Sequence, residues 1–164
     1  MSFKTLVMAT AATITLAIPA IAEGMIMVND PYLRTSMKNA KSGAAFMIVM
    51  NHGAEDDQLI DARSDIAKRV ELHTHKENAE GVMRMMHVPE GFTIPSHGEH
   101  KLMRGGDHVM FMGLNQPLEH GDTADVILVF EKAGEVSVSI PVDLERKPMH
   151  GGGQMNHGEH KMNN

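Results

Sequence analysis

Histidine and methionine are the side chains of this sequence most able to bind a metal, and several of them occur in alternating pairs. The chain of 164 residues has 11 His, 16 Met and no Cys. In a β-strand, residues i and i+2 point to the same face and lie about 6.6 Å apart. Three strand-like segments therefore each present two potential ligands on one face. These pairs are His73 with His75, Met83 with Met85, and His108 with Met110.

The combination of imidazole and thioether indicates copper. Thioether sulfur is a soft ligand that selects Cu(I), and neutral imidazole binds copper in either oxidation state. In an oxidising compartment thiols are consumed as disulfides, whereas a thioether forms none. A site of His and Met without Cys therefore suits Cu(I) binding in an exported protein. Methionine also fills irregular cores, and we expect Met47, Met50 and Met112 to be core residues.

The N-terminal segment has the pattern of an export signal. Lys4 gives a short basic start, residues 6–18 are apolar or small, and Ala20-Ile21-Ala22 has the small-x-small form of a cleavage site. The apolar run is too short to cross a bilayer. We therefore expect a signal peptide at residues 1–22, cleavage after Ala22 and a periplasmic protein without stable membrane insertion.

Short apolar runs separated by Gly, Pro, Asn and Asp predict an all-β fold. The run GAAFMIVM at 43–50 reads as a buried strand, and the residues on either side of Lys132-Ala133-Gly134 read as a hairpin. No long stretch has helical periodicity, so the pattern predicts a single β-sandwich or barrel at residues 23–146. The expected strands are 43–50, 59–60, 70–75, 81–88, 108–114, 125–131 and 135–142.

Three motifs resemble those of a known family of copper proteins. VELHTH at 70–75, GVMRM at 81–85 and GGDHVMFMGL at 105–114 resemble the periplasmic copper chaperones of the PCu(A)C type, and the resemblance covers about residues 25–142. It implies a cupredoxin-like Greek-key fold that binds one Cu(I) through two His and two Met. It also implies delivery of copper to the CuA centre of cytochrome c oxidase, with oxidase subunit II or another copper assembly protein as partner.

The resemblance leaves two ligand assignments open. The family spacing is His, ten residues, Met, twenty-one residues, His, one residue, Met, and its last pair matches His108 and Met110. Taken literally, this spacing selects His75 and Met86 upstream. The local landmarks VELH and GVMRM select His73 and Met85 instead, with one extra residue in each loop. We favour the landmarks, because loops absorb insertions whereas a one-residue slip turns every strand side chain to the other face. Met83 shares the face of Met85 and is a possible auxiliary ligand.

The pentapeptide HGEHK occurs at 97–101 and again at 157–161. The first copy follows Ile94-Pro95, which predicts a turn, and its histidines have no assigned role. The second lies in a segment without apolar periodicity, residues 147–164, which we expect to be a flexible tail. Its ligands predict a second copper site, for Cu(II) through imidazole or Cu(I) through thioether. These residues are Met149, His150, Met155, His157, His160 and Met162.

Composition and missing motifs exclude several classes of protein. A net charge of -6 argues against a nucleic-acid partner, and a chain without Cys lacks the thiolate ligand of blue-copper electron carriers. No zinc-hydrolase, phosphate-loop or dinucleotide motif is present, so we expect a protein that is not an enzyme. We also expect it to be a monomer. A delivering metallochaperone and a periplasmic copper-buffering protein without specific delivery both remain open.

Overall fold

The computed structural model describes residues 25–37 and 39–147, which form ten β-strands. Nowhere in these residues is there a helix long and apolar enough to cross a membrane. The strands are β1 (Ile26–Thr35), β2 (Ser42–Asn51), β3 (Asp57–Arg63), β4 (Ala67–Glu77), β5 (Met83–His87), β6 (Phe92–Ile94), β7 (Glu99–Leu102), β8 (His108–Leu114), β9 (Thr123–Phe130) and β10 (Gly134–Pro141).

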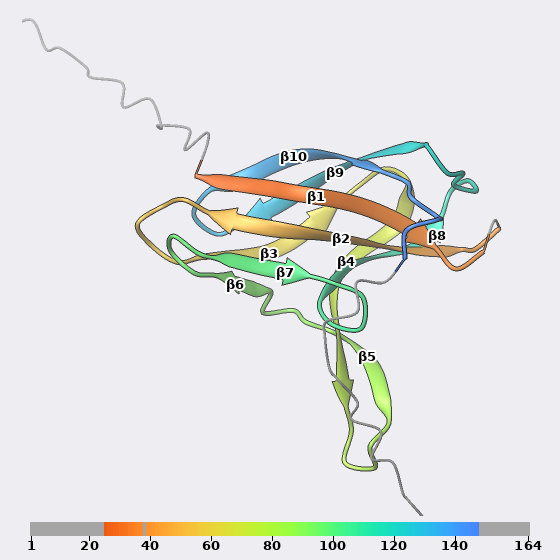
Figure 1. The fold of residues 1–164 in the computed structure, drawn as a ribbon, viewed down its shortest axis with the longest axis horizontal. Coiled ribbons are helices and arrows are strands. Elements are labelled where there is room, and N and C mark those ends of the chain that lie inside the picture. The colour runs from red at the N-terminus through yellow and green to blue at the C-terminus, as the bar shows by residue number, and fades with distance from the viewer. Residues whose placement is uncertain (1–24, 38, 148–164) are drawn as a thin grey trace, which may run out of the picture.

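The strands form two antiparallel sheets that pack face to face as an open sandwich (Figure 1). The larger sheet has the order β1-β2-β8-β4-β5, and β7 pairs with β2 beyond the end of β8. The smaller sheet has the order β10-β9-β3-β6. The predicted all-β class is confirmed, and because neither sheet closes on itself the architecture is a sandwich and not a barrel.

The core between the sheets is built mainly from Phe, Leu, Ile and Val. Phe111, Phe130 and Leu59 are among its fully buried side chains, and Met47 is the one methionine in the core of the described residues. Alternation along the strands sends one set of side chains into this core and the other set to the outer face of the sheet.

Two methionines predicted to be core residues lie on the outer face instead. Met50 is partly exposed and pairs with Met27 of β1. Met112 is also partly exposed, and its sulfur lies 3.6 Å from an Arg69 guanidinium nitrogen. The prediction was wrong because β2 and β8 carry apolar residues on both faces, so a continuous apolar run did not mean burial of every member.

The β4–β5 hairpin projects away from the sandwich (Figure 1). Every residue of β5 is exposed, and β5 is the edge strand of the larger sheet. The hairpin thus places the side chains of β5 beside those of β4 and leaves them open to solvent.

Strand β7 was not expected from the sequence. It contains His100, which we predicted to lie in a turn, and its pairing with β2 sets Val49 opposite His100. The sequence EHKL has no apolar run, so its strand conformation comes from this tertiary pairing. A tight loop follows, in which the Met103 amide donates to the Asp107 carbonyl at 2.8 Å and the Gly106 amide to the Met103 carbonyl at 3.0 Å. This loop leads directly into His108.

Candidate metal centre

The strand register gathers histidine and methionine side chains on the outer face of the larger sheet. Strand β4 lies between β8 and β5, and His73 is directly opposite His108 on one side and His87 on the other. His75 is opposite Met85. Residues directly opposite across a pair share a face, as do residues i and i+2. The residues of this face are His73, His75, Met83, Met85, His87, His108 and Met110.

His108 is held in one orientation with one nitrogen lacking a partner. Its side chain is 1% exposed, and its Nδ1–H donates to the Gly106 carbonyl at 2.9 Å. The buried Nε2 atom has no hydrogen-bond partner. With the proton on Nδ1, Nε2 presents a lone pair, which is the arrangement of a metal-binding imidazole that donates its other N–H to the protein.

His73 shows the same arrangement with its two nitrogens exchanged. Its Nε2–H donates to Glu71 Oε2 at 2.8 Å, and its buried Nδ1 atom has no partner. Glu71 is also 3.1 Å from the Arg69 guanidinium. The hydrogen bond from His73 is the main cause that lowers the pKa of the Glu71 carboxyl group. Glu71 therefore stays charged and fixes the tautomer that leaves Nδ1 available.

The imidazole rings of this face lie close enough to approach one ion. The ring centroids of His73 and His108 are 6.0 Å apart, and those of His75 and His108 are 5.1 Å apart. His75 Nδ1 lies 3.4 Å from the same Gly106 carbonyl that His108 uses. The contact of His75 with this carbonyl is therefore longer than that of His108.

His87 belongs to this group, although it was not among the predicted ligands. Its ring centroid is 5.8 Å from that of His73, and its side chain is exposed. The sequence did carry a signal, because His87 follows Met85 by two residues and so shares its face of β5.

The structure separates Met85 from its rival Met86. Met85 is opposite His75 on the histidine-bearing face, whereas Met86 is opposite Thr74 and points to the other face of the hairpin. Met110 follows His108 by two residues and lies opposite Glu71. Met85 is 44% exposed and Met110 is partly exposed. The face thus combines buried imidazoles with solvent-accessible thioethers.

No three His, Asp or Glu side chains in the described part of the chain are arranged to hold a metal ion. The other donors that the strand register places on this face are the thioethers of Met85 and Met110. The donor set that results is neutral, which favours a soft monovalent ion over the hard divalent cations that prefer carboxylates.

Burial lowers the pKa of His108 below its ordinary value of 6.5. The hydrogen bond to the Gly106 carbonyl opposes this shift, and the nearby His75 and His73 rings add to it. His108 is therefore neutral, and able to bind a metal, at pH values where an exposed histidine is partly protonated.

Two sets of predicted features lie outside the described residues. They are the signal peptide at residues 1–22 and the tail ligands Met149, His150, Met155, His157, His160 and Met162.

The outer-face cluster lies on a fold shared with solved copper-protein domains. The copper-bound PCuAC domain from PmoF2 is 26% identical, with a TM-score of 0.60 over 74% of this chain and 94% of that domain. The solution structure of Cu(I)-bound DR1885 from Deinococcus radiodurans is 28% identical, with a TM-score of 0.56 over 76% of this chain and 85% of that one. The predicted cupredoxin-like fold is thereby confirmed.

A family model described as putative lipoprotein LpqE-like matches residues 26–142, and the chain belongs to this family. A putative lipoprotein of Leifsonia xyli subsp. xyli is 36% identical over 108 residues, which are 65% of this chain. The matched region spans 64% of that relative's length, slightly less than two thirds.

The buried His108 predicts a pH dependence of stability. Because its pKa is lowered in the folded state, the unfolded chain takes up a proton at a higher pH than the folded chain. The free energy of unfolding should therefore fall as the pH drops below 6.5. The variant His108→Asn should lose less of this free energy. Urea unfolding of both copper-free proteins at about pH 7.5 and about pH 5.5 measures the difference. Equal losses in the two proteins would contradict this role of His108.

Proposed function

We propose that this chain is a copper metallochaperone that binds one Cu(I) ion through His73, Met85, His108 and Met110. The observation that carries the proposal is the pair of buried imidazole nitrogens, His73 Nδ1 and His108 Nε2, which lack hydrogen-bond partners. Each ring is anchored by its other nitrogen. The copper-bound and Cu(I)-bound states named for the structural neighbours support the same cargo.

The donor set explains why the proposed ion is Cu(I). Two neutral imidazoles and two thioethers add no negative charge, and soft sulfur favours the soft monovalent ion. The hydrogen bond to Glu71 fixes the tautomer and the ring orientation of His73, as carboxylate partners do for metal-binding histidines. His75 lies beside this donor set, with its ring centroid 5.1 Å from that of His108.

The exposure of the two thioethers suits release of the ion to another protein. Met85 lies on an edge strand that projects from the sandwich, so a partner can approach the ion from that side. A partner ligand would displace a thioether while the two anchored imidazoles still hold the ion. This stepwise exchange is the behaviour required of a carrier, and it needs no catalysed reaction.

The cellular role that we propose is delivery of Cu(I) to the CuA centre of cytochrome c oxidase, through oxidase subunit II or another copper assembly protein. The protein would act as a periplasmic monomer after removal of residues 1–22. The domain would comprise residues 23–146, and the tail at 147–164 would form an additional copper site, the tail site. The composition of the tail, with three His and three Met in residues 149–162, supports the tail site.

Met85→Leu should weaken Cu(I) binding by more than about a hundredfold, because even the loss of a ligand's hydrogen-bond partner costs up to that much. His73→Ala and Met110→Leu should act in the same way. The matched control is Met86→Leu, the same substitution at the neighbouring position on the opposite face. Anaerobic titration with Cu(I) against a coloured competing chelator gives the affinities.

The outcome that contradicts this ligand set is an equal loss of Cu(I) affinity in Met85→Leu and Met86→Leu. Circular dichroism of each variant establishes that the fold is retained. We call the site of His73, Met85, His108 and Met110 the strand site. A separate titration with Cu(II) should give the same result for all these variants, because Cu(II) is expected to bind the tail and not the strand site.

Delivery predicts a phenotype that copper buffering does not. A host lacking this protein should lose cytochrome c oxidase activity when copper is scarce, and the wild-type chain but not Met85→Leu should restore it. The measurement is oxidase activity of washed membranes, with Met86→Leu as the complementing control. Normal oxidase activity together with increased sensitivity to excess copper would instead support the buffering function.

A further inference from the structure

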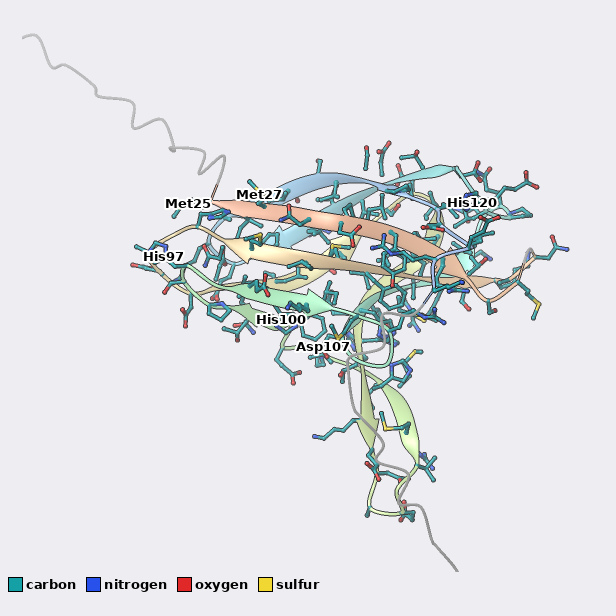
Figure 2. All side chains as sticks on the ribbon, viewed as in Figure 1. Met25, Met27, His97, His100, Asp107 and His120 are labelled. Atoms are coloured by element: carbon teal, nitrogen blue, oxygen red, sulfur yellow. The ribbon has the colours of Figure 1, made fainter. Side chains whose placement is uncertain are left out.

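We propose a second site for a soft monovalent cation, Cu(I) or Ag(I), formed by Met27, Met50, His52 and His97. It lies on the outer face of the larger sheet, at the end where β1 begins (Figure 2). None of its residues belongs to the strand site described above, so its existence does not depend on the proposed function.

The two methionines of this site are paired by the sheet register. Met27 of β1 is directly opposite Met50 of β2. Directly opposite residues share a face and have Cβ atoms about 4.5–5.5 Å apart, a separation that allows two thioethers to bind one ion. Met27 is 49% exposed and Met50 is partly exposed. Asn29, two residues after Met27, places its side-chain nitrogen 3.0 Å from the Met50 sulfur, which fixes that sulfur on this face.

Backbone hydrogen bonds bring two histidines to the same end of the sheet. His52 follows Met50 by two residues, and its amide donates to the Met25 carbonyl at 2.7 Å, which continues the β1–β2 pairing. The Asn51 amide donates to the Gly98 carbonyl at 2.9 Å, and the His97 amide donates to the Gly53 carbonyl at 3.2 Å. These two backbone hydrogen bonds hold the turn that contains His97 next to the backbone of His52. Figure 2 shows Met27 and His97 at this one end of the sandwich.

The surroundings favour a metal site over a merely apolar surface. On the side of β2 away from β1, Met50 is opposite Glu99 of β7. The Glu99 carboxylate is paired with Lys101, whose Nζ lies 2.8 Å from Glu99 Oε1. The register and the backbone hydrogen bonds bring two methionines and two histidines to this end of the sheet, residue types that match the neutral donor set proposed for the strand site. Met25 is not part of the set, because its methyl carbon lies against Gly53, 2.5 Å from where a Cβ would stand.

The backbone of His97 is also unusual. Its φ of 51° lies in the left-handed region, which non-glycine residues seldom adopt. Such conformations cost free energy and cluster at functional sites. The backbone hydrogen bonds to Gly53 and Asn51 hold the turn in place, so the His97 backbone keeps this conformation and its position relative to the His52 backbone.

This site gives the first HGEHK copy two separate roles. His100 stacks on Phe92, with ring centroids 5.1 Å apart, and pairs with Asp107 at 2.9 Å, so it stabilises the loop that precedes His108. His97 faces solvent and is available to a metal.

The two metal sites are separate but lie on one face of the molecule. Along β2, Met50 is six residues from Ala44, which is opposite Met110. At about 3.3 Å per residue this separation is roughly 20 Å. No ligand can belong to both sites. The second site is more exposed and has no buried unpartnered nitrogen, so it should bind more weakly than the strand site and fill after it.

Methionine-methyl NMR of the full chain tests the second site. With ¹³C-labelled methionine methyl groups, Ag(I) serves as a stable soft probe. The expected result is that the Met85 and Met110 signals shift first, and that the Met27 and Met50 signals then shift together. Met37, which is 68% exposed and lies apart from this cluster, is the control and should not move. In Met27→Leu the Met50 shift should be lost while those of Met85 and Met110 remain.

Two results would overturn the second site. One is that Met27 and Met50 do not shift after the strand site is full, or shift only in parallel with Met37. The other is that His52→Ala and His97→Ala both leave the Ag(I) response of Met27 unchanged, which would show that these histidines are not ligands of the site. If the strand site did not bind the ion, the Met85 and Met110 signals would not shift, and this result is independent of the Met27 and Met50 signals.

Discussion

The register of β4 between β5 and β8 is the constraint on which the rest of the structure depends. It sets Leu72 against Val109 in the core and, by alternation, His73 against His108 on the outer face. A slip of one residue would expose Leu72 and turn the histidines inward. Burial of a leucine side chain contributes about 1.5–3 kcal/mol. The hydrophobic core therefore holds the imidazoles in position, although it contains none of the metal ligands.

The proposed strand site has a rigid inner half and an accessible outer half. His73 and His108 are anchored by Glu71 and by the Gly106 carbonyl, and each keeps a buried nitrogen without a partner. A buried polar group without a partner costs about 1–3 kcal/mol, and an ion that binds there removes this cost. The thioethers lie nearer the solvent. This division combines retention of the ion with a route for its release.

The sequence predicted which residues share a face within a strand, but not which strands are neighbours. The pairs His73 with His75 and His108 with Met110 follow from a period of two, as does the all-β class. The roles of Glu71 and Gly106, the closeness of His87 to His73, and the choice of Met85 over Met86 as the methionine on the histidine-bearing face depend on strand pairing, to which distant residues contribute. The same reason explains why Met50 and Met112 were wrongly assigned to the core. The ligand assignment itself stays a prediction.

The measurement that tests the central claim most directly is X-ray absorption at the copper edge of the protein loaded with one equivalent of Cu(I). We predict a first shell of two nitrogen and two sulfur atoms. We also predict that Met85→Leu loses one sulfur, whereas Met86→Leu keeps both. A shell without sulfur, or one that Met85→Leu leaves unchanged, would contradict the proposed site on the outer face of β4, β5 and β8.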